Sequence, residues 1–259
     1  MKSKLILMLA LLPAIAFADT FRQTRTLQVP AAGVKELSVR CGAGSLTLQG
    51  VEEVDIIMVS AEIESEGTDK NKFQLLADKL VQLKLDREHD KAALLSDIAK
   101  QPFAGMDARI NLQIAVPVTM DIKIADGSGE IAAKNIIGDL NIDDDSGGIQ
   151  IEDITGRIFI KDGSGDIEIE EVSGPIEIED GSGEIVIQHA TGDVVIKDTS
   201  GGIEINDIGG NVTVSDGSGS IDIYQVQKNV FIREAGSGKL EIDGVQGKVT
   251  IRDEGEGGE

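Results

Sequence analysis

The chain has 259 residues and a formal net charge of −22 at pH 7. This acidity argues against binding to nucleic acid or anionic membranes, and it favours cations or a basic partner. Cys41 is the only cysteine, which excludes an internal disulfide and a cysteine-rich metal site. With six Phe, one Tyr and no Trp, the chain offers little basis for aromatic stacking on sugars or bases.

The first 18 residues have the features of a signal peptide. Lys2 and Lys4 precede an almost wholly apolar run over residues 5–17, and Ala-Phe-Ala at 16–18 forms a small-x-small cleavage site. We expect cleavage near Ala18 and an exported protein, periplasmic or secreted to the cell surface. The apolar run is too short for a spanning helix and no later stretch is apolar enough, so no transmembrane segment is expected.

Residues 19–116 are expected to form an N-terminal β region that begins with a degenerate coil of a longer repeat. Apolar and polar residues alternate at period two, which is typical of half-buried strands. Overlay on the later repeat puts Cys41 at the place of its Asp and Ala43 at the place of its Ser. The apolar places of the coil are taken by Leu37, Val39, Leu46, Leu48 and Val51.

An insertion over about residues 61–110 breaks this pattern. Residues 70–80 carry four apolar side chains on one helical face, with Thr68 or Asp69 as the N-cap. A hairpin is expected over residues 81–98, followed by a loop at Pro102 and Gly105. We expect this α+β segment to cap the open end of the fold, because repeat arrays must hide their terminal strand edges.

The second half of the chain repeats a short turn motif every 18 residues. A fixed period of this length indicates a stacked-repeat fold. Each coil divides into two nine-residue halves with the pattern Gly-x-Ile-x-Ile, so each half should form one strand with aliphatic side chains inside. The serines that mark the period are Ser128, Ser146, Ser164, Ser182, Ser200 and Ser218, and Ser237 follows after 19 residues.

A single coil of this kind is too small to fold alone. It buries five aliphatic side chains, worth roughly 1.5–3 kcal/mol each, whereas fixing 18 residues costs about 1–2 kcal/mol apiece. Stacking makes the apolar columns continuous. We therefore predict a mainly β fold, a parallel β-solenoid of two-strand coils over residues 117–253, roughly 34 Å long, before an acidic tail at 254–259.

Two further segments accompany the signal peptide and the repeats. Residues 41–48 read Cys-Gly-Ala-Gly-Ser-Leu-Thr-Leu, and Ala115-Val116-Pro117 lead into the Gly-Ser-Gly-x-Ile repeats. With these features the sequence resembles, over most of residues 30–253, the bacterial putative adhesins built on the domain of unknown function DUF4097. The resemblance implies a β-solenoid fold and brings no catalytic residues.

An aspartate recurs before each turn and suggests a calcium ladder, because hard cations prefer clustered carboxylate oxygens. The alternative is structural, with each Asp accepting a hydrogen bond from its own turn. Like charges about 4.8 Å apart in water repel by only ~0.9 kcal/mol, less than the roughly 1.5–3 kcal/mol of a charge-assisted hydrogen bond. We favour the structural role and expect no metal or other cofactor. The ladder would comprise Asp144, Asp162, Asp180, Asp198 and Asp216, with Asp126 before it, Asp253 after it and Glu234 interrupting it.

The serine column lacks a base that would make its members nucleophiles. The only histidines are His89 and His189, and His189 lies beside the corner residue Ala190, away from the Ser turns. The seven serines are therefore expected to be small, hydrogen-bonding corner residues.

Outward acidic residues are expected to gather on one broad face. One interpretation is a binding surface for a basic protein or divalent ions. The other, which we favour, is a solvated face whose charge prevents aggregation of the parallel strands. The residues are Glu152, Asp153, Asp166, Glu168, Glu170 and Glu171, with Glu184 and Glu204 nearby.

Other positions depart from the repeat or suggest chemistry. Asp143, Asp144 and Asp145 resemble the acid pairs of solenoid polysaccharide lyases and hydrolases, but no His or Arg at adjacent columns completes an acid–base set, so we expect no catalytic residues. Lys228 replaces a corner glycine. Cys41 is expected to be a partly buried small residue, with a reactive thiol or an intermolecular disulfide as the alternative.

These features predict an exported, non-enzymatic β-solenoid that acts as an adhesin-like interaction or scaffold module of the cell envelope. Its partner would be an envelope or surface protein or a polysaccharide. The alternatives are a polysaccharide-active enzyme on the same fold and a calcium-binding envelope protein.

Overall fold

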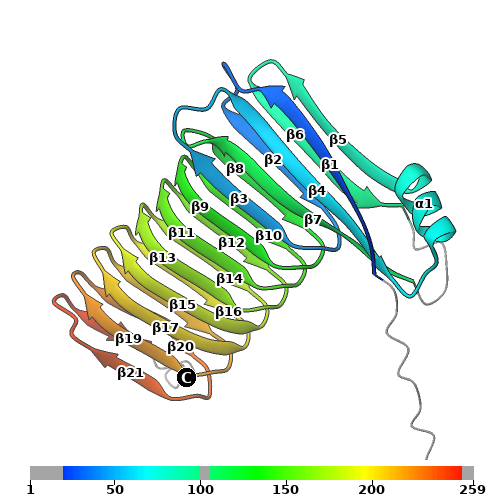
Figure 1. The fold of residues 1–259 in the computed structure, drawn as a ribbon. Helices are drawn as coiled ribbons and strands as arrows, with labels where there is room; N and C mark the ends of the chain where they lie inside the picture. Colours follow the sequence, from blue (N-terminus) through cyan, green and yellow to red (C-terminus); the bar gives the residue numbers. More distant parts are fainter. Residues whose placement is uncertain (1–19, 100–105, 253–259) are drawn as a thin grey trace, which may run out of the picture.

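The computed structural model describes residues 20–99 and 106–252. Their strands form two sheets, and successive coils stack along one axis to make a solenoid of about seven turns (Figure 1). This confirms the predicted fold class. The predicted signal peptide, the loop at Pro102 and Gly105, Asp253 and the acidic tail lie outside the described residues. The division into an N-terminal region and a repeat region at residue 117 stays a prediction.

Each sheet has eleven strands, and their order in space differs from their order along the chain. Sheet A consists, from one edge to the other, of β1 (Phe21–Pro30), β4 (Ile56–Glu66), β7 (Asp107–Pro117), β3 (Leu46–Val51), β9 (Ile131–Ile137), β11 (Ile149–Thr155), β13 (Ile167–Ser173), β15 (Gly183–Ala190), β17 (Gly201–Ile208), β19 (Ile221–Val226) and β21 (Leu240–Asp243). Sheet B consists of β22 (Val249–Ile251), β20 (Val230–Ala235), β18 (Val212–Asp216), β16 (Val194–Asp198), β14 (Ile176–Asp180), β12 (Ile158–Asp162), β10 (Leu140–Asp144), β8 (Asp121–Asp126), β2 (Glu36–Cys41), β6 (Lys91–Ile98) and β5 (Val81–Glu88).

The solenoid strands pair in parallel with the strands one coil away, and the 18-residue period sets the register. Ile167 of β13, for example, lies opposite Ile149 of β11 and Ile185 of β15. The inward Ile and Val side chains of both sheets are buried in one continuous core, except in the last coil, where Val249 and Ile251 are exposed. A slip of one residue would turn these side chains outward, so burial of the aliphatic face fixes the register.

One irregularity lies in β20, where the chain accommodates the residue inserted before Ser237. The pairing shifts after Val214, so that Ser215 lies opposite Glu234 and Asp216 lies opposite Ala235. The expectation that Glu234 interrupts the Asp column is therefore wrong. The inserted residue leaves Glu234 exposed, and Ala235 takes the inner position instead.

The degenerate first coil and the insertion also follow the sequence pattern. Strand β2 pairs with β8, strand β3 pairs with β9, and Ala43 bridges Ser128 in the turn. The other edges of this coil are covered as well, because β6 of the insertion pairs with β2 and β7, which follows the insertion, pairs with β3. The antiparallel strands β4, β1 and β5 extend the two sheets further.

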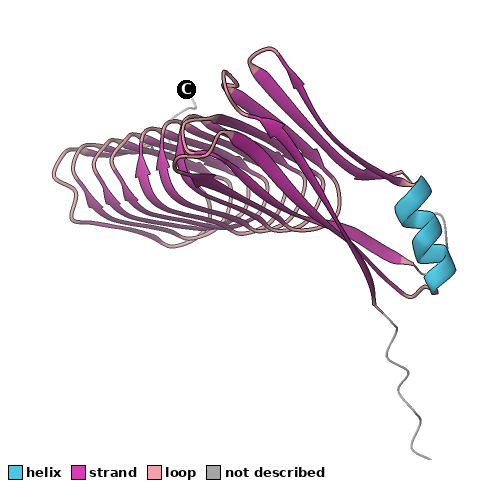
Figure 2. Cartoon of the chain, turned by 45° about the horizontal axis from the view of Figure 1, so that its top comes forward, coloured by secondary structure: helices cyan, strands magenta, loops and turns pink. Residues whose placement is uncertain are grey.

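A short helix joins the ends of the two sheets. Helix α1 (Lys70–Lys79) begins at its N-cap Asp69, whose carboxylate accepts hydrogen bonds from the backbone N–H groups of Asn71 and Lys72. The helix buries Phe73, Leu76 and Ala77, and the ring of Phe73 stacks on that of Phe21. It contacts β1 and β5, the outermost strands of the two sheets, at one end of the long N-terminal strands (Figure 2).

Glycines at the Ser turns let stacked coils touch through their backbones. Gly165 has φ +146°, and a Cβ added there would lie 1.7 Å from the carbonyl oxygen of Gly147 one coil away. Gly148, in the same turn of the preceding coil, has more room. A Cβ at Gly148 would meet nothing closer than the carbonyl oxygen of Asp166 at 3.9 Å.

Gly165→Ala should therefore lower the free energy of unfolding by about 3 kcal/mol or more, because the new methyl group forces two backbones apart. Gly148→Ala is the matched control and should change it by less than about 1 kcal/mol. Urea unfolding followed by circular dichroism measures both. Equal effects of the two substitutions would contradict the backbone contact.

Candidate functional site

The Asp column lies inside the solenoid, at the corner where each sheet-B strand ends. In-register pairing places Asp144 opposite Asp126 on one side and Asp162 on the other. The weak repulsion between neighbouring aspartates that the sequence led us to expect applies to carboxylates in water. That expectation is wrong, because all six aspartates of the column are buried. Their exposed fractions are 6% for Asp126, 3% for Asp144, 5% for Asp162, 5% for Asp180, 7% for Asp198 and 0% for Asp216.

The predicted turn hydrogen bond is present at four members of the column. The Oδ1 atoms of Asp144, Asp180, Asp198 and Asp216 each accept a hydrogen bond from the backbone N–H two residues later, over 3.3, 3.3, 3.0 and 2.9 Å. Burial, together with charges in neighbouring coils, raises the pKa of Asp144, Asp162 and Asp198 to about 6. Among the described residues, no three His, Cys, Asp or Glu side chains are grouped so as to hold a metal ion.

The serines serve the turns as predicted. The hydroxyl groups of Ser146 and Ser200 donate to the backbone carbonyls of Gly127 and Gly181 in the preceding coils. His189 is the last residue but one of β15, at the opposite corner, where its Nδ1 lies 3.8 Å from a carboxylate oxygen of Glu170. His89 follows β5 in the hairpin, so neither histidine lies at a Ser turn.

A second side-chain ladder, at the corner that follows the sheet-A strands, was missed by sequence reasoning. The Oδ1 of Asp139 accepts a hydrogen bond of 2.9 Å from the N–H of Arg157, and the Oδ1 of Asp193 accepts one of 2.7 Å from the N–H of Asn211. Asp or Asn directly after a corner glycine, at residues 139, 193 and 211, was the available signal, but Arg157 and Pro175 interrupt it in the coils between. These carboxylates are exposed, and each stabilises the backbone of the next coil.

A left-handed residue near the end of each regular sheet-A strand was also missed. Asp153, Glu171 and His189 have φ between 55° and 57°, as do their equivalents in other coils. Asn, Asp and His tolerate this conformation better than most residues, and they occupy four of the six equivalent positions, whereas Glu171 and Gln225 obscure the signal.

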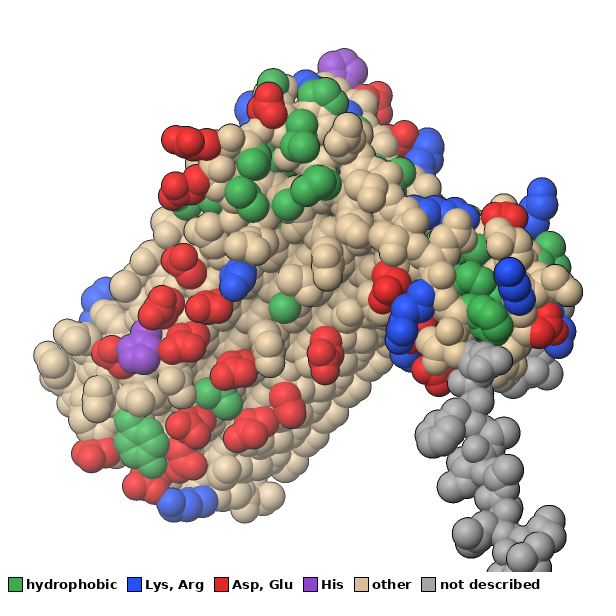
Figure 3. All heavy atoms as spheres, viewed as in Figure 1, with side chains coloured by type: hydrophobic (Ala, Val, Ile, Leu, Met, Phe, Trp, Pro, Cys, Tyr) green, Lys and Arg blue, Asp and Glu red, His purple; other side chains and the backbone are tan. Residues whose placement is uncertain are grey.

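The expected acidic face is the outer surface of sheet A. Glu152 lies opposite Glu170, and Gln150 lies opposite Glu168. A hollow of about 320 Å³ opens on this surface, with Ala132 and Lys134 on one side and the three glutamates on the other. Acidic side chains gather along this part of the rod (Figure 3). We call the outer surface formed by Lys134, Gln150, Glu152, Glu168 and Glu170 the acidic face.

Asp143, Asp144 and Asp145 do not converge as a catalytic acid pair would. Successive residues of a strand point to opposite faces, so Asp143 is exposed outside sheet B while Asp144 is buried inside. Asp145 is exposed in the following turn. The three carboxylates therefore point in different directions.

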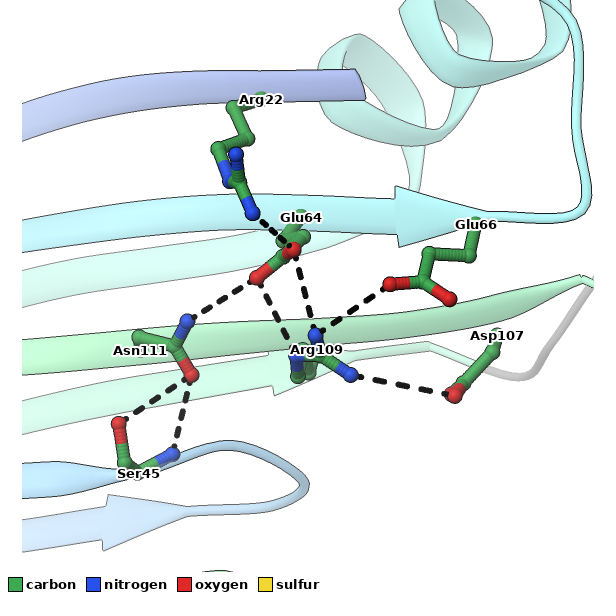
Figure 4. Close-up of polar contacts among 7 residues, drawn as sticks. All are labelled: Arg22, Ser45, Glu64, Glu66, Asp107, Arg109 and Asn111. Carbon is green, nitrogen blue, oxygen red and sulfur yellow. Dashed lines mark hydrogen bonds and ion pairs between the residues drawn. The ribbon is translucent and has the colours of Figure 1, made fainter. Parts of the chain in front are cut away.

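A buried glutamate, ion-paired with two partly exposed arginines, ties the N-terminal strands of sheet A together. Glu64 of β4 lies opposite Arg22 of β1 and Arg109 of β7, with distances of 2.7 and 3.2 Å from its Oε1 to the two guanidinium groups. Asn111 connects Glu64 to Ser45 of the first turn (Figure 4). Burial alone would raise the pKa of Glu64, but the two arginines hold it below its usual range.

Comparison with known proteins agrees with this architecture. The profile of the Toastrack DUF4097 family matches residues 5–207. The chain belongs to the Toastrack DUF4097 family. A search of curated proteins finds no match.

Solved structures similar to this Toastrack chain share little sequence with it. A putative cell adhesion protein from Clostridium sporogenes is 14% identical, with 89% of this chain and 100% of that chain covered and a TM-score of 0.31. A putative adhesin from Bacteroides fragilis is 13% identical, with 89% and 97% covered and a TM-score of 0.38. A putative lipid binding protein from Parabacteroides distasonis is 12% identical, with 88% and 96% covered and a TM-score of 0.42.

Within residues 20–99 and 106–252 of this Toastrack chain, no helix combines the length and the hydrophobicity that crossing a membrane requires.

Cys41 lies at the N-terminal end of the Asp column. It is partly buried, and its Sγ lies 3.9 Å from the carbonyl oxygen of Ala125. Burial and the neighbouring Asp126 carboxylate raise the pKa of the thiol. Because the thiolate is the reactive form, this environment opposes the alternative of a reactive cysteine.

The folded Toastrack chain should therefore react with an aromatic disulfide reagent at least about tenfold more slowly than the urea-unfolded chain at the same pH. The absorbance of the released thiolate measures both rates. Equal rates, or a disulfide-linked dimer on a non-reducing gel, would contradict the unreactive thiol.

Proposed function

We propose that this protein is an exported, non-enzymatic interaction module of the cell envelope, and that its acidic face binds a cationic segment of an envelope or surface protein. The observation that carries the proposal is the in-register pair of Glu152 and Glu170, with Glu168 beside Glu170 on β13, around a hollow. A charged row of fixed spacing on a rigid sheet suits an extended basic partner.

The hollow favours binding over a face that is merely solvated. Ala132 occupies the outward position that Gln150 and Glu168 take in the next coils, so the surface is recessed beside the acids. A recess lets a partner side chain lie between carboxylates and lose part of its hydration, which strengthens the attraction between unlike charges.

The remaining parts of the proposal rest on the sequence and on the alternation of the strands. The basic, apolar and small-x-small segments of residues 1–18 support export. The divergent directions of Asp143 and Asp144 support a non-enzymatic role, because a glycosidase needs two carboxyl groups that flank one bond.

Neutralising the acidic face tests the binding. Glu168→Gln with Glu170→Gln should weaken binding of an oligolysine peptide by about tenfold at low ionic strength, and salt should reduce the difference. The matched control is Glu177→Gln with Glu179→Gln, which removes the same charge from sheet B. Fluorescence anisotropy measures the peptide, and crosslinking to envelope extracts of the mature chain and both variants identifies the natural partner.

Two outcomes would contradict the proposal. Equal loss of binding in both double variants would mean that net charge alone attracts the peptide. Cleavage of a neutral or anionic polysaccharide that disappears in Asp143→Ala and Asp144→Ala would support the enzyme alternative instead.

A further inference from the structure

The buried Asp column contains more carboxylate oxygens than the turns can satisfy. One oxygen of Asp144, Asp180, Asp198 and Asp216 accepts the turn N–H, whereas the Oδ2 atom of each is buried without a hydrogen-bond partner. Neither oxygen of Asp126 or Asp162 makes a hydrogen bond of ordinary geometry, although N–H groups of their own turns lie near both carboxylates. A buried ionised carboxylate in this state is strongly destabilising, so the column needs a further source of hydrogen bonds or positive charge.

The groups that face the column do not supply positive charge. Besides one another, the six aspartates lie near Cys41, Asp145, Asp166 and Glu234, and each of these is acidic or neutral. Within the described residues, no Lys, Arg or His forms an ion pair with a member of the column. The column ends at Cys41 on one side and at Ala235 on the other.

The neighbouring aspartates are themselves close enough to help. In-register strands one coil apart are separated by about 4.8 Å, so a carboxyl group that turns one oxygen toward its neighbour comes within reach of a hydrogen bond. A protonated carboxyl donates such a bond to an ionised one, and bonds between O–H and O⁻ are short and strong.

We propose that the column from Asp126 to Asp216 is a proton-binding ladder, in which alternate carboxyl groups hold a proton and donate it to the carboxylate of the next coil. No covalent chemistry is involved, because each proton comes from solvent and stays on oxygen. Sharing of this kind gives the buried oxygens a donor and removes about half of the buried charge.

Calcium binding accounts less well for the buried carboxylate oxygens that lack a hydrogen-bond partner. Calcium takes about six to eight oxygen ligands, whereas the described residues contain no group of three or more acidic, His or Cys side chains placed to hold a metal. Between two coils the column offers two carboxyl groups. A shared proton needs only those two.

The ladder couples folding of the solenoid to pH. Burial raises the pKa of Asp144, Asp162 and Asp198 from an unperturbed 3.8 to about 6. The folded chain therefore binds protons more tightly than the unfolded chain. This contribution to stability is complete below about pH 4, and it is lost as the pH rises through about 6.

Asparagine at alternate positions would mimic the state in which alternate carboxyl groups are protonated. The side-chain NH₂ of each Asn donates a hydrogen bond to the neighbouring carboxylate at every pH. The melting temperature of the wild-type chain should fall between pH 5 and pH 8. The whole chain carrying Asp144→Asn, Asp180→Asn and Asp216→Asn should lose most of this fall and melt about 4 °C or more above wild type at pH 8. Glu152→Gln with Glu168→Gln and Glu170→Gln is the control, which removes three charges from the outer surface and should keep the wild-type slope.

Infrared spectra of the wild-type chain provide a readout that does not depend on a variant folding. Protonated carboxyl groups should persist at pH 6, where exposed acids have already ionised. A flat melting profile, an equal loss of slope in the control, or no protonated carboxyl at pH 6 would overturn the proposal. A large rise in melting temperature with millimolar calcium, reversed by EDTA and absent from the asparagine variant, would also overturn the proposal. It would mean that a metal ion, rather than a shared proton, pairs with the carboxylates of the column.

Discussion

Stacking of identical coils at a fixed spacing is the constraint on which the rest of this structure depends. Strand hydrogen bonds hold neighbouring coils about 4.8 Å apart, and the 18-residue period brings each side chain opposite the residue at the same position of the next coil. At the inward and turn positions, where one residue type recurs, that type is acceptable only if it tolerates a column of itself. Isoleucine in the core meets this condition through close packing, and glycine in the turns meets it because the backbones touch.

Charged residues meet the same condition in three different ways. The glutamates of the acidic face remain in water, where repulsion between neighbours is weak. Asp139 and Asp193 use each carboxylate to accept a hydrogen bond from the backbone of the next coil. The buried Asp column has neither water nor a full set of donors, so it is the place where repetition creates an electrostatic conflict.

The N-terminal region shows how the repeat begins without leaving open edges. The insertion and the strands that flank it extend both sheets beyond the first coil, and the outermost of these strands pair antiparallel rather than in parallel. Glu64 between Arg22 and Arg109 then joins three of these strands by charge rather than by repetition. Interactions that occur once in the molecule, rather than in every coil, are thus found at the N-terminal end of the stack.

The sequence by itself determined the solenoid, the two strands per coil, the degenerate first coil and the helix after Asp69, because hydrophobic period and capping chemistry are local signals. It also predicted the turn role of the Asp and Ser columns. Only the tertiary structure decided that Asp144 and its equivalents are buried and that Ala235 rather than Glu234 ends the column. The depth to which the carboxylates are buried and the shift of register at the inserted residue depend on how neighbouring coils pack, and the 18-residue period alone does not contain them.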